Sequence, residues 1–182
     1  SRVRLALESG SLTGAKVLLV YLPASERPDV KVLESISKHP QRYLDKAPLP
    51  LYTRSQRELA IYALYKTAES WPEIAADRLR RIAGKLPEEE RDYAWAQIAS
   101  VATRNLHPGA LAWFRNAGDG MNNRQLGWYG RAALREGNWN ETLAAINAMS
   151  SPERLRPQWR YWRARALATL GRASEANLLL AP

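Results

Sequence analysis

The sequence repeats itself near its C-terminus with an offset of 34 residues, and this repeat constrains the fold more than any other feature. Trp128 aligns with Trp162, and Gly137 aligns with Gly171. Other positions agree at the same offset: Gly130 with Ala164, Arg131-Ala132 with Arg165-Ala166, Glu141 with Glu175, and Ile146 with Leu180. Each of the two aligned turn glycines stands where a first helix should end. Such a unit cannot bury its apolar face alone, so neighbouring units must stack.

Helical periodicity runs through the whole chain, without a convincing strand pattern. Proline and glycine mark the boundaries, and Thr53 and Gln56 have the spacing of a capping box. The expected helices span 1–9, 13–22, 28–37, 53–70, 72–83, 87–104, 108–116, 122–136, 139–149, 152–170 and 172–180. The sequence therefore predicts an all-α fold: a right-handed superhelix of stacked antiparallel helix pairs, which is a tetratricopeptide-like α-solenoid.

We expect residues 1–182 to form one α-superhelical domain or a fragment of one. A break is expected at 39–52, because Pro40, Pro48 and Pro50 prevent a continuous helix there, although a short helix around 42–45 is compatible with the pattern. The chain begins without Met and stops just after an apolar helix stripe, so we interpret both ends as cuts inside a longer protein. No run approaches the roughly 18 uncharged apolar residues of a membrane span.

The composition is basic and unusual in its aromatic residues. The formal net charge is +9, and seven Trp and eight Tyr stand against a single Phe. A basic chain favours anionic partners such as nucleic acid, acidic glycans or a membrane surface, although a solvated basic face is commoner. Trp and Tyr join an apolar ring to a polar atom, so they suit either half-buried seams between helices or surfaces that stack sugars and bases.

No pattern in the sequence predicts a catalytic, cofactor or metal site. The absence of Cys excludes disulfides, zinc–thiolate sites and thiol nucleophiles. His39 and His107 both precede proline and match no metal-ligand spacing. The acidic run 88–90 follows Pro87, where it suits the first turn of a helix and needs no catalytic interpretation. We therefore expect no catalytic residue, no cofactor and no metal in this chain.

One surface is a candidate for binding a substrate or partner. On the expected helix 152–170, Trp159 and Trp162 fall on one stripe, and Arg156, Arg160 and Arg163 fall on a second stripe beside it. The simpler interpretation is a packing seam whose rim is covered by arginine side chains. The functional interpretation is a basic groove with an aromatic edge, which would take an anionic polymer. We expect the two repeat tryptophans, Trp128 and Trp162, to be packing residues, with Trp162 packed on the helix that follows it.

The same part of the chain resembles the superhelical domain of soluble lytic murein transglycosylases. The resemblance is carried by 158–167 (QWRYWRARAL), by Leu170-Gly171 and by Glu175-Ala176. Two earlier segments, 91–96 (RDYAWA) and 131–139 (RAALREGNW), are similar to the helices that precede this cluster in that family. The resemblance covers most of 53–182, whereas 1–50 matches only in its helical, proline-punctuated character.

The resemblance implies a role in the cell wall. In that family a U-shaped chain of helices closes into a ring, and a lysozyme-like C-terminal domain cleaves peptidoglycan strands as a lyase, leaving a 1,6-anhydro end. The catalytic Glu of the family lies in a Glu-Ser motif followed by Gly-Leu-Met-Gln. Here Glu8-Ser9, Glu34-Ser35 and Glu69-Ser70 lack that continuation. The resemblance therefore implies a non-catalytic, periplasmic scaffold segment that holds or orients peptidoglycan, without the catalytic domain and with cell-wall synthesis or remodelling proteins as further partners.

Two other functions remain open at this point. A helical-repeat array can bind a peptide or a protein on one face, as tetratricopeptide arrays do. The charge and the aromatic residues also suit a helical repeat that binds nucleic acid, whose affinity should fall steeply with salt.

Overall fold

The computed structural model describes residues 2–46 and 51–180, and this part of the chain is entirely helical, without strands. The helices in chain order are α1 (Arg2–Glu8), α2 (Leu12–Leu19), η1 (Ala24–Glu26), α3 (Val30–Lys38), α4 (Pro40–Lys46), α5 (Arg54–Ser70), α6 (Pro72–Ile82), η2 (Ala83–Lys85), α7 (Glu88–Arg104), α8 (Ala110–Phe114), α9 (Asn123–Arg135), α10 (Trp139–Ala148), α11 (Ser151–Arg154), α12 (Pro157–Thr169) and α13 (Ala173–Leu180). The prediction of an all-α fold is confirmed.

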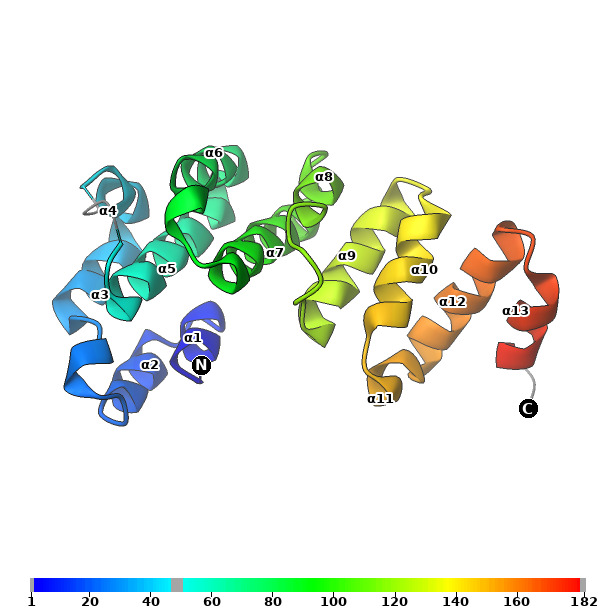
Figure 1. Cartoon of the computed structure of the whole chain (residues 1–182), viewed down its shortest axis with the longest axis horizontal. Coiled ribbons are helices and arrows are strands. Elements are labelled where there is room, and N and C mark those ends of the chain that lie inside the picture. The colour runs from blue at the N-terminus through cyan, green and yellow to red at the C-terminus, as the bar shows by residue number, and fades with distance from the viewer. Residues whose placement is uncertain (1, 47–50, 181–182) are drawn as a thin grey trace.

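The helices stack in one elongated array that runs from an N-terminal block to α13 (Figure 1). In the N-terminal block, α5 is the central helix and packs against α1, α3, α4, α6 and α7. The array then continues through contacts of α7 with α9, α9 with α10, α10 with α12, and α12 with α13. Each helix therefore contacts mainly its neighbours along the array, as an α-solenoid requires.

The 34-residue repeat is confirmed by the helix boundaries. Helix α12 begins and ends 34 residues after α9, and α13 begins 34 residues after α10. Gly137 and Gly171 have φ angles of 67° and 79°, the left-handed conformation that glycine adopts without strain. At each of these turns the amide of the glycine and that of the next residue donate to carbonyls in the last turn of the preceding helix, which is a Schellman motif.

A third turn has the same geometry with a different residue. The amide of Leu106 donates to the carbonyl of Thr103, and the amide of His107 donates to that of Ala102, at the end of α7. Leu106 therefore occupies the position of the two repeat glycines, with a φ of 56°. Because a side chain at this φ crowds the backbone, Leu106 is a strained residue at an otherwise regular turn.

The predicted helix 152–170 is wrong at its N-terminal end. The chain there forms two helices, α11 and α12, and Arg156 between them has an extended backbone. The cause is Pro157, which disfavours the helical conformation at the residue before it and is itself suited to the first turn of a new helix. Leu155, which a continuous helix 152–170 would place on the stripe of Trp159 and Trp162, is consequently 59% exposed.

The segment 39–52 contains a short helix, as the sequence pattern allowed around 42–45. Pro40 begins α4, which packs against α3 and α5, and Leu51 is buried. The rest of this expected break, 47–50, lies outside the described residues. One continuous apolar core extends on both sides of the segment, from Val3 to Ala133, and two smaller clusters lie among α9, α10, α12 and α13.

Candidate functional site

The three arginines of the predicted surface each have a different partner. Arg156 forms an ion pair with Glu153 at 3.2 Å. Arg160 donates to the backbone carbonyl of Leu179 in α13 at 2.7 Å. Arg163 donates from Nε to the side-chain oxygen of Asn147 in α10 at 2.8 Å, and partial burial lowers its pKa. Two of the three guanidinium groups therefore join α12 to neighbouring helices.

Trp159 is a buried packing residue, so its predicted place on an exposed surface is wrong. Its side chain is 3% exposed, and its Nε1 donates to Glu153 at 3.1 Å. The indole lies against Gly127 and Gly130 of α9: a Cβ on Gly127 would be tight against the ring at 3.2 Å, whereas one on Gly130 would be at ordinary contact distance, 3.4 Å. The guanidinium of Arg131 lies 4.9 Å from the Trp159 ring and 5.1 Å from the Trp128 ring, within the range of a cation–π interaction with both.

The two repeat tryptophans are both half-buried. Trp128 packs against the main core, and Trp162 packs against the cluster formed by Leu126, Ile146, Met149 and Trp159. That cluster belongs to α9, α10 and α12, so the expectation that Trp162 packs on the following helix, α13, is wrong. The physical reason is that α12 packs on the preceding helix pair, α9 and α10, through Trp159. Trp162 lies one helical turn after Trp159 and therefore faces the same side.

A large cleft lies elsewhere, between the N-terminal ends of α5, α7 and α9 and the side of α1. It encloses about 780 Å³. Three arginines and five acids line it, together with five uncharged residues: Arg4, Arg54, Arg57, Glu58, Glu88, Glu89, Glu90, Asp92, Tyr93, Ala117, Gly120, Met121 and Gln125. The lining is thus rich in charge of both signs, in a chain whose formal net charge is +9.

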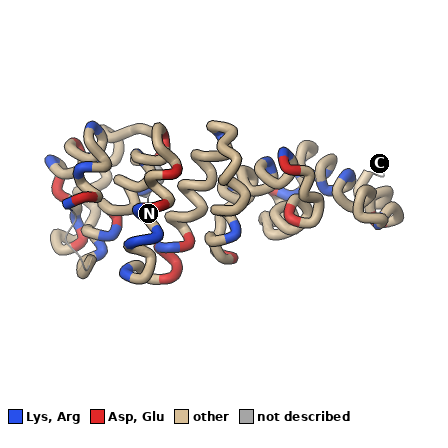
Figure 2. The backbone as a smooth tube through the Cα atoms, turned by 90° about the horizontal axis from the view of Figure 1, so that it is seen from above, with Lys and Arg blue, Asp and Glu red and all other residues tan. Residues whose placement is uncertain are grey.

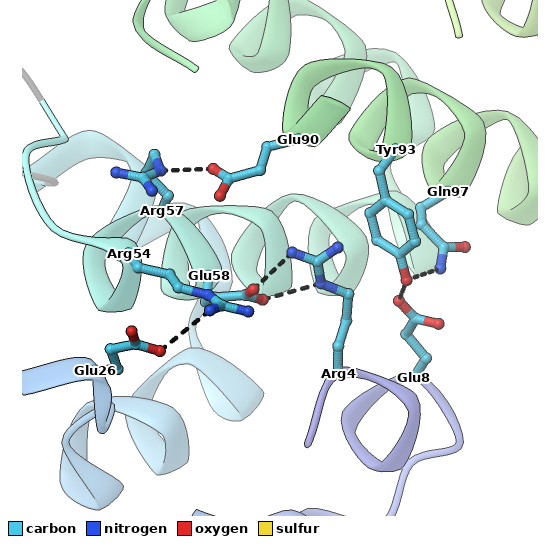
Figure 3. Close-up of polar contacts among 9 residues, drawn as sticks. All are labelled: Arg4, Glu8, Glu26, Arg54, Arg57, Glu58, Glu90, Tyr93 and Gln97. Atoms are coloured by element: carbon cyan, nitrogen blue, oxygen red, sulfur yellow. Dashed lines mark hydrogen bonds and ion pairs between the residues drawn. The ribbon is translucent and has the colours of Figure 1, made fainter. Parts of the chain in front are cut away.

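Most charges in this cleft are paired across helices (Figure 3). Arg4 of α1 forms two hydrogen bonds with Glu58 of α5, at 2.9 and 2.6 Å, and Arg57 of α5 pairs with Glu90 of α7 at 2.6 Å. Arg4 also lies over the ring of Tyr93 at 4.2 Å. The buried amide of Gln125 is not satisfied, since its Nε2 has no hydrogen bond within the described part of the chain. The cleft is therefore mainly a joint that ties α1, α5 and α7 together.

Glu8 extends this joint beneath the cleft. Its carboxylate accepts a hydrogen bond from the Tyr93 hydroxyl, which in turn accepts one from Gln97 Nε2 at 2.7 Å (Figure 3). The Tyr65 hydroxyl donates to the backbone carbonyl of Glu8 at 2.8 Å. Burial raises the pKa of the Glu8 carboxyl, and burial together with the Glu8 charge raises the pKa of Tyr93. A raised carboxyl pKa suits a general acid, but Glu8 lines a cavity of only about 10 Å³ and not the large cleft.

A second pocket, of about 490 Å³, lies at the ends of α3 and α5 and the start of α4. Three cations line it, Lys38, Arg42 and Lys66, together with the exposed indole of Trp71. Lys66 pairs with Glu69. This pocket combines exposed aromatic and basic side chains, which the sequence led us to expect on α12.

Sequence reasoning missed both sites because their residues are far apart in the chain. Arg4 and Glu58 are separated by 54 positions, and Arg57 and Glu90 by 33. The acidic run 88–90 was assigned to the first turn of α7, which is correct, but its pairing with α5 has no local signal. Trp71 did have a signal, because it is the single residue between the expected helices 53–70 and 72–83.

Charged residues are interleaved along the array, with acids and bases mixed most densely in the N-terminal block (Figure 2). Within the described residues, no three or more His, Asp or Glu side chains form a group that could hold a metal ion. Also within these residues, no helix has the length and apolar character needed to cross a bilayer.

Comparison with known proteins gives one informative result. No family model matches the chain, and no curated protein matches it in sequence. Among solved structures, it is similar to an inactive mutant of the lytic transglycosylase Slt from Pseudomonas aeruginosa, with a TM-score of 0.67 and 22% sequence identity. The similarity covers 98% of this chain and 30% of the Slt chain. This chain therefore has the fold of a part of a lytic transglycosylase.

Proposed function

We propose that this chain is a non-catalytic, superhelical scaffold segment of a periplasmic lytic transglycosylase. In this role it holds or orients peptidoglycan for a lysozyme-like domain that cleaves the glycan strands. The observation that carries the proposal is the similarity to Slt, which extends over 98% of this chain but only 30% of that enzyme. The solenoid architecture supports it further, because stacked helix pairs present long surfaces to extended partners.

The geometry of the described residues supports a binding role rather than a chemical one. The carboxyl with a raised pKa, that of Glu8, is buried between α1, α5 and α7 and does not line the large cleft. The charges in that cleft are largely engaged in pairs that hold helices together. Cleavage is accordingly assigned in this proposal to another domain of the full protein, and cell-wall synthesis or remodelling proteins are proposed as further partners.

The test uses purified peptidoglycan sacculi. We expect the chain to co-sediment with sacculi and to release no anhydro-muropeptides, as measured by mass spectrometry of the supernatant. Release of such products by the pure chain would overturn the non-catalytic assignment. Absence of co-sedimentation would overturn the binding role, and a steep loss of binding to single-stranded DNA with rising salt would then favour a nucleic-acid partner.

A further inference from the structure

The backbone at Trp71 is fixed, but the fold does not require an indole there. Trp71 lies between the last residue of α5 and Pro72, and its backbone is non-helical (φ −139°, ψ 68°), because the proline that follows disfavours the helical conformation. Its amide donates to the carbonyl of Thr67 at 2.8 Å, and its carbonyl accepts from the amide of Ala75 at 3.1 Å. Many residue types could adopt this conformation. The indole nevertheless is 56% exposed, on a backbone that both neighbouring helices hold in place.

Two of the three cations around this indole have no carboxylate partner in the described part of the chain. Lys38 and Arg42 line the same pocket, and neither forms an ion pair with a carboxylate of residues 2–46 or 51–180. Lys66 is already paired with Glu69, the acidic residue of the pocket lining. The lining thus carries three cations and one carboxylate, a formal charge of +2. It differs in this respect from the large cleft, whose arginines are engaged with acids.

The polar groups of this pocket suit a ligand with several hydroxyls and few charges. α3 and α5 end at the pocket and α4 begins there, so backbone carbonyls and backbone amides of helix ends are both present. Two carbonyls in the last turn of α5 are already engaged, because Thr67 accepts from the Trp71 amide and Glu69 accepts from Asn105 Nδ2. The side chains of Gln41 and Ser70 add further donors and acceptors to the lining. A ligand with several hydroxyls and a single acid group matches these neutral polar groups and the cations Lys38 and Arg42 together.

We propose that this pocket binds an acidic saccharide. One face of a sugar ring stacks on the indole of Trp71, its hydroxyls pair with neutral polar groups of the lining such as Gln41 and Ser70, and its carboxylate lies between Lys38 and Arg42. The volume of about 490 Å³ is within the range of pockets for small ligands. The choice of a cell-wall sugar rests on the proposed scaffold function. The requirement for a sugar ring with an acid group rests on the indole and the cations of the pocket itself.

The experiment is a titration of the full chain with two sugars that differ in one acid group. N-acetylmuramic acid carries a carboxylate on a lactyl ether at its 3-oxygen, where N-acetylglucosamine has a hydroxyl. The readout is the indole N–H signal of Trp71 in NMR, assigned with Trp71→Phe. We expect saturable shifts with N-acetylmuramic acid at about 1–10 mM and weaker binding of N-acetylglucosamine. No shift at Trp71 with either sugar would overturn the proposal, as would equal affinity for both.

Variants separate stacking from charge. For the variants, affinities are measured from the signals of the sugars in ligand-observed NMR, because Trp71→Ala has no indole signal at this site. Trp71→Ala should weaken binding of both sugars about three- to tenfold, because it removes the stacking surface. Arg42→Gln should weaken only N-acetylmuramic acid, by about threefold. The matched control is Tyr52→Ala, which removes another exposed ring outside the pocket and should leave both affinities unchanged. A mononucleotide that shifts the Trp71 signal at lower concentration than N-acetylmuramic acid would overturn the saccharide assignment.

The sacculus assay distinguishes the two proposals. Binding of N-acetylmuramic acid at Trp71 without co-sedimentation of the chain would overturn the scaffold function and support the pocket. Co-sedimentation without any sugar binding at Trp71 would overturn the pocket and support the scaffold function.

Discussion

The indole of Trp159 lies so close to Gly127 that a Cβ built on this glycine would be 3.2 Å from Cζ2 of the ring. A Cβ on Gly130, one turn later, would be 3.4 Å from Cζ3 of the same ring. Two glycines of α9 thus form the seat for one tryptophan of α12. Together with the packing of α10 on α12, this seat positions the last helix pair in the array.

Trp159→Ala should therefore destabilise the chain strongly. The indole is buried and its removal leaves a cavity that the rigid helices cannot fill, so we expect a loss of about 3–5 kcal/mol in the free energy of unfolding. Urea denaturation followed by circular dichroism measures this loss. Trp162→Ala is the matched control, and its half-buried side chain should cost less. Equal costs for the two variants would contradict the packing described here.

Arg160 and Arg163 should stabilise α12 rather than bind a ligand. Each donates to an oxygen on a neighbouring helix, Leu179 in α13 and Asn147 in α10. Arg160→Gln or Arg163→Gln should lower the free energy of unfolding by about 0.5–1.5 kcal/mol, since each loses one hydrogen bond. Co-sedimentation with sacculi should not change. Arg156→Gln, at an exposed ion pair, serves as the control with a smaller effect. Reduced sacculus binding with unchanged stability would restore the predicted binding surface on α12.

Local signals in the sequence predicted the fold better than they predicted the sites. The 34-residue offset predicted the helix boundaries correctly because both helices end at a glycine, Gly137 or Gly171, that adopts the positive φ needed at the turn. The predicted helix 152–170 is too long because the apolar periodicity continues through Pro157. The helix is interrupted by the proline's restriction on the backbone of one residue, Arg156, which periodicity does not reveal. Burial of Trp159 depends on two glycines about 30 positions earlier, so its own helix contains no sign of it.

The charged cleft shows the same limit. Glu90 begins α7 with its neighbours, as the sequence predicted, yet its partner Arg57 comes from another helix. Only the stacking of α5 on α7 brings the two side chains together. Trp71 is the residue of these sites with a local signal, because it lies between two predicted helices and directly before a proline, although this signal restricts its backbone and not the exposure of its indole.

Glu8 should make stability depend on pH. Burial raises the pKa of its carboxyl above the usual 4.5, although hydrogen bonds from Tyr93 and Gln97 and the charge of Arg4 oppose this shift. A folded-state pKa above the unfolded one means that the full contribution to stability is present at low pH and is lost as the pH rises through the folded-state pKa. Glu8→Gln retains an acceptor for Tyr93 and should remove this loss. The variant should therefore be more stable than the original chain at pH 7.

The check for Glu8 is urea denaturation at two pH values, about pH 3.5 and pH 7. The gain from Glu8→Gln should be larger at the higher pH. Tyr93→Phe provides the opposite control, because it removes the hydroxyl that donates to the charged carboxylate. It should destabilise the chain more at pH 7 than at low pH. A Glu8→Gln variant that is less stable than the original at pH 7 would show that the ionised carboxylate is favourable in the fold.

Leu106→Gly should stabilise the chain, which is unusual for a substitution by glycine. Leu106 has a φ of 56° at the end of α7, in the position that Gly137 and Gly171 occupy in the later turns. Its side chain is 73% exposed, so little packing is lost when it is removed. Relief of the left-handed strain exceeds the entropy that glycine adds to the unfolded state, which leaves a net gain of about 0.5–1 kcal/mol. Leu106→Ala removes the same exposed side chain but keeps a Cβ at positive φ, so it should give no such gain in thermal or urea denaturation. Equal stability of the two variants would mean that the exposed leucine, and not its backbone conformation, determines the energy of this turn.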